Sequence, residues 1–285
     1  MMKTVLLTGT STGLGAELAI RLAKKGYRVW ATMRNLDKKD KLADRAITNG
    51  VELVFYRLDV EDPRSIETCV KAMIEQEGRI DIVINNAGAG FVRSTEQASE
   101  AEINWVMNVN FMGVVRVTKA VIPHMREQRS GHIINISSVG GLVGQPFNEV
   151  YCAAKFAVEG YTEAMASYLE EAFGLKFSLI EPGGITSEFG ATVFAQLDAT
   201  GGIREDEYLP VLQRYITKAQ QRSKSKDKIF QSCEEVAEVV IACIESQDPP
   251  IRVRSSQWAE NFCRFKTEAD PNGKKQQRMV KEVML

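Results

Sequence analysis

The chain has little of what metal and thiol chemistry needs: two histidines, and five cysteines spread singly along 285 residues without a CxxC pair. This scarcity excludes a histidine-rich metal site and argues against a disulfide framework, a zinc site or a Ser-His-Asp hydrolase. We therefore expect reduced thiols, a cytoplasmic location and no bound metal.

Long apolar runs are also missing. No stretch reaches the ~18 consecutive apolar residues of a membrane span, and the run that begins at Val5 is too short for a signal-peptide core. The net charge of −1 gives no positive field for nucleic acid. These absences favour a globular protein that acts on a small molecule.

The first two-thirds of the chain alternates short β-branched runs with longer amphipathic stretches. We expect strands at 3–8, 28–32, 51–57, 80–85, 132–137 and 176–181, and helices at 14–25, 38–49, 63–78, 103–128 and 151–173. Strands that are apolar on both faces predict a parallel sheet covered by helices on both sides. The expected fold class is α/β, a Rossmann-type doubly wound sheet whose ligand crevice lies at the carboxyl ends of the strands. No linker divides the chain, so we expect residues 1–285 to form a single domain.

The pattern loosens after Pro182. We interpret residues 187–230 as a substrate lid, with an apolar first half that covers the ligand and a charged second half (KAQQRSKSKDK) that stays at the solvent edge as a hinge. A helix is expected at 234–245 and a short strand at 251–254. The polar C-terminal extension, 255–285, is expected to pack only through its last apolar residues.

A glycine-rich turn follows the first expected strand and precedes a helix. It comprises Gly9, Thr10, Ser11, Thr12, Gly13, Leu14 and Gly15. Glycines at such a place let the backbone approach a pyrophosphate, which the helix N-terminus favours. The second strand ends at Arg34, where a protein selective for NAD(H) would carry an acid. The Arg34 guanidinium and the Ser11 hydroxyl therefore predict NADP(H) as the cofactor rather than NAD(H).

Tyr151 and Lys155 lie four residues apart at the start of an expected helix and share one face. A free tyrosine titrates near ~10, and a close ammonium group lowers that pKa toward neutral pH. Such a pair can transfer a proton during carbonyl reduction or alcohol oxidation. Ser138, at the end of an expected strand, can hold the substrate oxygen, and Asn110 lies in an otherwise apolar helix.

Taken in order, these motifs resemble those of the short-chain dehydrogenase/reductase family, from Lys3 to about Ile185. The matching motifs are TGxxxGxG at 8–15, NNAG at 85–88, Asn110, Ser138, YxxxK at 151–155 and Pro182-Gly183. The resemblance implies that Tyr151 is the general acid/base and that Ser138 orients the carbonyl. It also implies that Lys155 lowers the pKa of Tyr151 and, like Tyr151, contacts the nicotinamide ribose, while Asn110 maintains a water relay to Lys155. Further cofactor contacts implied by the resemblance are Asp59, Val60, Asn86, Ala87, Gly88, Pro182, Gly183, Ile185 and Ser187, the last replacing a threonine that members often carry.

Three segments resemble the hydroxysteroid and retinol dehydrogenase-like branch of this family: ATMRNL, EPGGITSEF and DPNGKKQQ. This resemblance implies a lipophilic alcohol or ketone, held by Ser138, Phe147, Phe189 and Val193, and a homodimer or homotetramer. Two alternatives remain open, a 3-oxoacyl-thioester reductase of fatty-acid type and a non-catalytic NADP(H)-sensing binding protein. A sensor would have no need of Tyr151.

Overall fold

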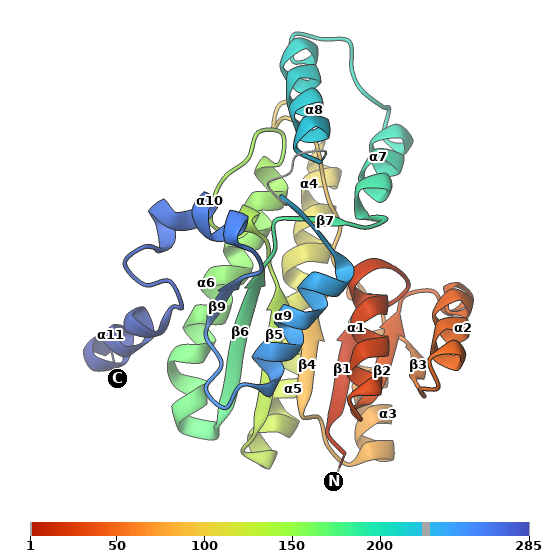
Figure 1. Cartoon of the computed structure of the whole chain (residues 1–285), viewed down its shortest axis with the longest axis vertical. Helices are drawn as coiled ribbons and strands as arrows, with labels where there is room; N and C mark the ends of the chain where they lie inside the picture. The colour runs from red at the N-terminus through yellow and green to blue at the C-terminus, as the bar shows by residue number, and fades with distance from the viewer. Residues whose placement is uncertain (1, 224–228, 285) are drawn as a thin grey trace.

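The computed structural model describes residues 2–223 and 229–284 (Figure 1). Among these residues, seven strands form one parallel sheet in the order β3-β2-β1-β4-β5-β6-β9. The strands are β1 (Thr4–Thr8), β2 (Arg28–Met33), β3 (Val54–Arg57), β4 (Ile82–Asn85), β5 (Gly131–Ile136), β6 (Leu175–Glu181) and β9 (Arg252–Arg254). The strand order reverses between β1 and β4, which is where doubly wound sheets bind their ligands. The expected fold class is confirmed.

Helices cover both faces of the sheet. One face packs against α1 (Gly13–Lys24), α2 (Asp40–Thr48) and α9 (Cys233–Glu245), and the other against α3 (Pro63–Glu77), α5 (Gly113–Gln128) and α6 (Glu149–Phe173). In β1, Val5 and Leu7 belong to the first core and Leu6 to the second, because successive side chains of a strand point to opposite faces. This explains why Val5, Leu6 and Leu7 are all apolar although they point to alternate faces.

The helix expected at 103–128 is one helical rod with an irregular turn inside it. It consists of α4 (Glu100–Met107), a π-helical turn, η2 (Asn108–Met112), and α5. A capping box of Ser99 and Glu102 starts it. Asn110 lies in the π-helical turn, where its fully buried amide nitrogen donates to the Val106 carbonyl at 3.1 Å. A single-turn π-helix inside an α-helix is a common mark of a functional position.

The segment after β6 rises above the carboxyl edge of the sheet (Figure 1). It contains β7 (Gly184–Thr186), α7 (Phe189–Ala199), α8 (Leu209–Ser223) and β8 (Phe230–Ser232), and β7 pairs with β8. The second half of this segment is helical as far as residue 223, where α8 ends, and its role as a hinge stays a prediction. The turn between α7 and α8 contains Gly201 and Gly202, both at positive φ (97° and 69°). Residues 224–228 (KSKDK) lie outside the described residues.

The C-terminal extension forms α10 (Gln257–Thr267) and α11 (Lys274–Met284). In α10, Ala259 and Cys263 are buried against Val139 and Leu142. Of the last apolar side chains that the structure describes, Met279, Val283 and Met284 are exposed and Val280 is half-buried. The expectation that the extension packs only through these last residues is therefore wrong, because the amphipathic α10 supplies its own buried face. Within the part of the chain that the structure describes, no helix is both long enough and apolar enough to cross a bilayer.

Candidate active site

The turn between β1 and α1 requires its glycines. Gly9 and Gly13 adopt positive φ (71° and 59°), a conformation that L side chains rarely take. A Cβ on Gly15 would lie 2.1 Å from the carbonyl oxygen of Gly9, and a Cβ on Gly9 would lie 2.8 Å from the Cα of Ala87. Three backbone segments therefore meet at distances that only glycine allows.

The N-terminus of α1 has the properties of a phosphate-binding site. Thr12 precedes the helix without a side-chain cap, and the first turn contains no acidic residue, so the first N–H groups remain available to an anion. Ser187 lies beside this turn, with its Cβ 3.5 Å from the position of a Cβ on Gly13. The Thr10 hydroxyl is buried and donates to the Thr32 carbonyl at 3.1 Å, so this residue fixes the loop. The turn as a whole fits the pyrophosphate of a dinucleotide.

The NNAG segment is tied to the same turn. The Asn86 side-chain amide donates to the carbonyls of Thr8 and Gly9, each at 3.0 Å, while the Thr8 hydroxyl accepts from the backbone N–H groups of Asn86 and Ala87. On its other side, a Cβ on Gly88 would lie 3.0 Å from Oδ1 of Asn110 and 3.8 Å from Nζ of Lys155. The segment thus joins the glycine turn to the catalytic candidates.

Asn110 holds the residue that follows the NNAG segment. Its side chain accepts from the Ala89 N–H at 3.0 Å and donates to the Ala89 carbonyl at 2.8 Å. In this arrangement the amide is occupied by backbone groups, and the water relay to Lys155 stays a prediction.

The residues expected at the adenosine end lie at neighbouring strand ends. Arg34 is exposed just after β2. Asp59, which follows β3, accepts a hydrogen bond from the Glu61 N–H at 3.1 Å, and Val60 is buried against Gly113. An exposed guanidinium at this edge is free to meet a charged group of a bound ligand.

The proposed catalytic residues come together at the carboxyl ends of β5 and β6. Ser138 precedes η3 (Val139–Gly141), and its hydroxyl is a hydrogen-bonding partner of Tyr151. Burial raises the pKa of Tyr151 to about 12, and the Ser138 hydrogen bond only partly offsets that rise. The Tyr151 hydroxyl is therefore protonated at neutral pH.

Lys155 lies deeper than Tyr151 on the same helix. Its ammonium donates to the Ile136 carbonyl at 2.8 Å and lies 5.9 Å from the centroid of the Tyr151 ring. Burial lowers the pKa of Lys155 to about 8. Burial is the largest cause of the raised Tyr151 pKa, and the expected lowering of that pKa by Lys155 stays a prediction.

Helix α7 covers this site. The Phe189 ring lies 6.5 Å from the Tyr151 ring, edge to face, and a Cβ on Gly90 would collide with both Val193 and Phe189. Phe147, also expected at the substrate, is buried with positive φ (60°) and packs against Tyr215 of α8 at 5.9 Å. Phe189 therefore lies next to Tyr151 and Val193 lies next to Gly90, whereas Phe147 packs against α8.

Sequence reasoning missed the residue that fastens α7. Arg93, almost fully buried, donates to Glu102 Oε1 at 3.0 Å and to both the carbonyl and the hydroxyl of Thr200 at 2.8 Å. We call this set of contacts the Arg93 latch. An arginine in a loop gives no periodic signal, and its partner Thr200 is 107 residues away, so only the structure reveals it.

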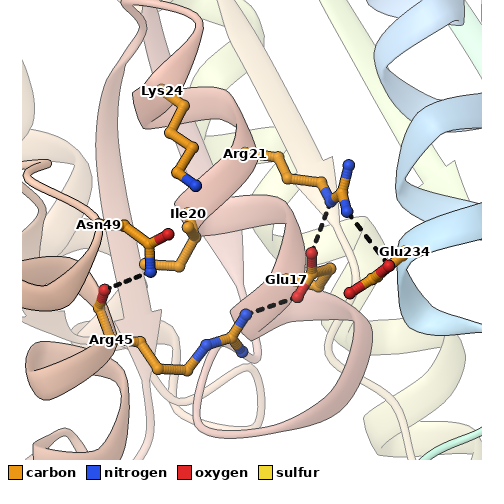
Figure 2. Close-up of a pocket in the computed structure, with 7 residues that line it drawn as sticks. All are labelled: Glu17, Ile20, Arg21, Lys24, Arg45, Asn49 and Glu234. Carbon is orange, nitrogen blue, oxygen red and sulfur yellow. Dashed lines mark hydrogen bonds and ion pairs between the residues drawn. The ribbon is translucent and has the colours of Figure 1, made fainter.

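A polar pocket of about 250 Å³ lies between α1, α2 and α9, away from these residues (Figure 2). Glu17 lies at its centre and binds both Arg21 and Arg45 at 2.5 Å. Its other lining residues are Ile20, Lys24, Asn49 and Glu234. These ion pairs join helices on one face of the sheet, and none of the expected site residues takes part.

Comparison with known proteins agrees with this geometry. The short chain dehydrogenase family matches residues 3–198. Bovine retinol dehydrogenase 8 is 38% identical over 95% of this chain and 86% of its own length. Human 17-beta-hydroxysteroid dehydrogenase type 1 is 34% identical over 94% and 82%. A solved short-chain dehydrogenase/reductase from Burkholderia phymatum, in complex with NAD, shares the fold with a TM-score of 0.80, covering 94% of this chain and 93% of its own at 23% identity.

Proposed function

Because this chain belongs to the short-chain dehydrogenase family, we propose that it is an NADP(H)-dependent oxidoreductase that interconverts a lipophilic alcohol and its carbonyl compound. One observation carries the proposal. Ser138, Tyr151 and Lys155 lie together at the same edge of the sheet as a glycine turn that fits a dinucleotide.

In the proposed reaction a bound nicotinamide supplies or accepts the hydride. Tyr151 donates its hydroxyl proton to the carbonyl oxygen during reduction and takes it back during oxidation, and Ser138 orients that oxygen. Lys155 keeps positive charge beneath the tyrosine, where it stabilises a developing phenolate. Helix α7 excludes water from these groups.

The apolar residues of the lid favour a lipophilic substrate. Phe189 and Phe194 are both partly exposed on α7, and Phe189 lies against Tyr151. Two similar proteins are named for retinol and for a 17-beta-hydroxysteroid, which supports a molecule of that size and polarity here. Assays with a steroid ketone, a retinoid and an acetoacetyl thioester, each with NADPH and NADH, test the substrate class. Turnover of the thioester alone would favour the fatty-acid alternative, and binding of NADPH without any turnover would favour a sensor.

Cofactor choice gives the first prediction. Arg34→Asp should weaken NADPH binding by roughly 10- to 100-fold, since a charge-assisted hydrogen bond worth ~1.5–3 kcal/mol is replaced by repulsion of the 2′-phosphate. NADH affinity should change much less. Kd values from nicotinamide fluorescence measure both, with exposed Arg64→Ala as the control. Equal Kd values for the two cofactors in the unaltered protein would contradict the assignment.

The second prediction concerns the Arg93 latch. Arg93→Ala removes four hydrogen bonds, to Glu102, Thr200 and Gly202, so amide exchange in α7 should accelerate by about tenfold or more. NADPH should slow exchange of α7 in the unaltered protein, and substrate should slow it further. Mass-spectrometric hydrogen exchange measures this, with exposed Arg126→Ala as the control. Exchange that neither the substitution nor NADPH alters would show that α7 is a fixed wall.

A further inference from the structure

One turn of α6 beyond Lys155 lies a glutamate that the proposed reaction does not use. Tyr151, Lys155 and Glu159 are spaced by four residues and so lie along one side of the helix. Glu159 is buried, as is Glu181 at the end of β6, directly before Pro182. Two carboxyl groups thus lie below the active site, where a charge is costly unless it is paired.

Among the described residues, only one of these two carboxyls forms an ion pair. Arg254 of β9 contacts Glu181 at 3.1 Å and Glu260 of α10 at 3.0 Å, so its single charge already faces two carboxylates. Among the described residues, no arginine or lysine forms an ion pair with Glu159. A third carboxylate would add an uncompensated charge to the interior, and the usual outcome is that such a group takes up a proton.

The hydrogen-bonding atoms lead to the same conclusion. Both carboxyl oxygens of Glu159 and Oε1 of Glu181 are buried, and the donor beside Glu159 is the neutral Ser137 hydroxyl, which carries no charge to balance a carboxylate. Yet the two side chains are hydrogen-bonding neighbours. Two carboxylates cannot bond to each other, whereas a carboxylic acid and a carboxylate can, through the one proton they hold. Burial and the nearby Glu181 charge also raise the pKa of Glu159 well above its ordinary value.

We propose that Glu159 and Glu181 share one proton and that Glu159 is thereby a positioning residue for Lys155 and for the turn that carries Ser138. The contact with that turn is close. A Cβ on Gly141 would lie 2.7 Å from the Ser137 hydroxyl and 2.9 Å from Glu159 Oε1, so both groups border the turn. Glu181 in turn ties the pair, through Arg254, to β9 and α10. The protonation claim stands on these contacts alone, and only the effect on turnover rests on the proposed function.

The shared proton makes stability depend on pH in a defined direction. Because the pKa of Glu159 is raised in the folded state, its contribution is fully present below the ordinary value of 4.5 and is lost as pH rises toward and through the folded value. Glu159→Gln keeps a donor toward Glu181 but does not titrate. The charged and titratable groups around the pair, which are unchanged in this variant, are Lys155, Glu163, Glu181, Arg252, Arg254, Glu260 and Cys263.

The test compares Glu159→Gln and Glu159→Ala with the unaltered protein and with Glu171→Gln, an exposed carboxyl on the same helix. Infrared spectra at neutral pH should show the carbonyl stretch of a protonated carboxylic acid in the unaltered protein and in Glu171→Gln, and that band should disappear in Glu159→Gln. Between pH 5 and 9 the Tm of the unaltered protein should fall relative to that of Glu159→Gln. These two readouts need no substrate, so they remain valid if the proposed function fails.

For turnover, we expect kcat of Glu159→Ala to fall about tenfold with little change in KM, and Glu159→Gln to restore most of it. An acid band that persists in Glu159→Gln, or parallel Tm curves for the two proteins, would overturn the shared proton. Full activity of Glu159→Ala would overturn the positioning role, as would equal losses in the alanine and glutamine variants. If Glu159→Ala does not fold, the pH profile of kcat in Glu159→Gln decides, since loss of the titrating acid should flatten its alkaline side.

Discussion

Replacing Tyr151 by phenylalanine should lower kcat by ~10²–10⁴-fold, the range usual for loss of a general acid/base. The substitution removes one hydroxyl and leaves the ring, which packs edge to face on Phe189. The pKa of about 12 means that the hydroxyl holds its proton at neutral pH, as a donor to a carbonyl oxygen must. Neither neighbour is placed to take over this role, because Ser138 is a much weaker acid and the Lys155 ammonium donates to the Ile136 carbonyl.

Steady-state kinetics in the direction of carbonyl reduction measure this loss, and nicotinamide fluorescence checks that cofactor Kd changes little. Tyr168→Phe is the matched control, since Tyr168 is an exposed tyrosine on the same helix and should retain full activity. A Tyr151→Phe variant that kept more than about a tenth of the original kcat would remove Tyr151 from the proposed mechanism.

Replacing Gly15 by alanine should cost both stability and cofactor affinity. Its Cβ would lie 2.1 Å from the Gly9 carbonyl oxygen and 2.6 Å from the Asn86 amide, so the turn between β1 and α1 has to move. Overpacking of this kind costs ~1–3 kcal/mol, which corresponds to roughly 5- to 100-fold in cofactor Kd when the strain acts on the binding loop. Tm should fall as well.

Gly160→Ala provides the control for this substitution. Gly160 lies in α6, and a Cβ there would meet nothing within 4 Å. Alanine is the better helix former by ~1 kcal/mol, so Tm should stay the same or rise. If Gly15→Ala bound NADPH as tightly as the unaltered protein, the turn would not be the pyrophosphate site.

The parts that sequence reasoning predicted are those encoded over short distances. The strands, the glycine turn and the Tyr151–Lys155 pair each depend on spacing within a few residues. The structure forms the sheet from these strands and places the turn and the pair at its carboxyl edge. Helix α8 carried a readable signal that its charges obscured. Leu209, Leu212 and Ile216 recur at helical spacing, and Leu212 is buried.

The contacts that were missed join residues far apart in the chain. Arg93 donates a hydrogen bond to Thr200, 107 residues later, and Glu181 accepts one from Arg254, 73 residues later. In the sequence, Arg93 and Glu181 look the same as solvent-exposed charged residues in a loop or at the end of a strand. Glu159 differs from these residues because the sequence does contain a signal for it. Its spacing of four residues from Lys155 places a carboxyl on the buried side of a helix. A charge on an otherwise buried helical stripe is the feature that would have identified it.

The π-helical turn at Asn108–Met112 makes the rod from α4 to α5 sensitive to its own length. A π-helical turn holds one residue more than the α-helical turn it replaces, and it keeps the helices on both sides in line. Deleting one residue from this turn would let the rod close into a regular α-helix and swing Asn110 away from Ala89, although every atom of its amide would still be present. The count of residues in this turn therefore matters more than their type, because it decides whether Asn110 reaches Ala89. Substitutions on the exposed side of the turn leave that count unchanged.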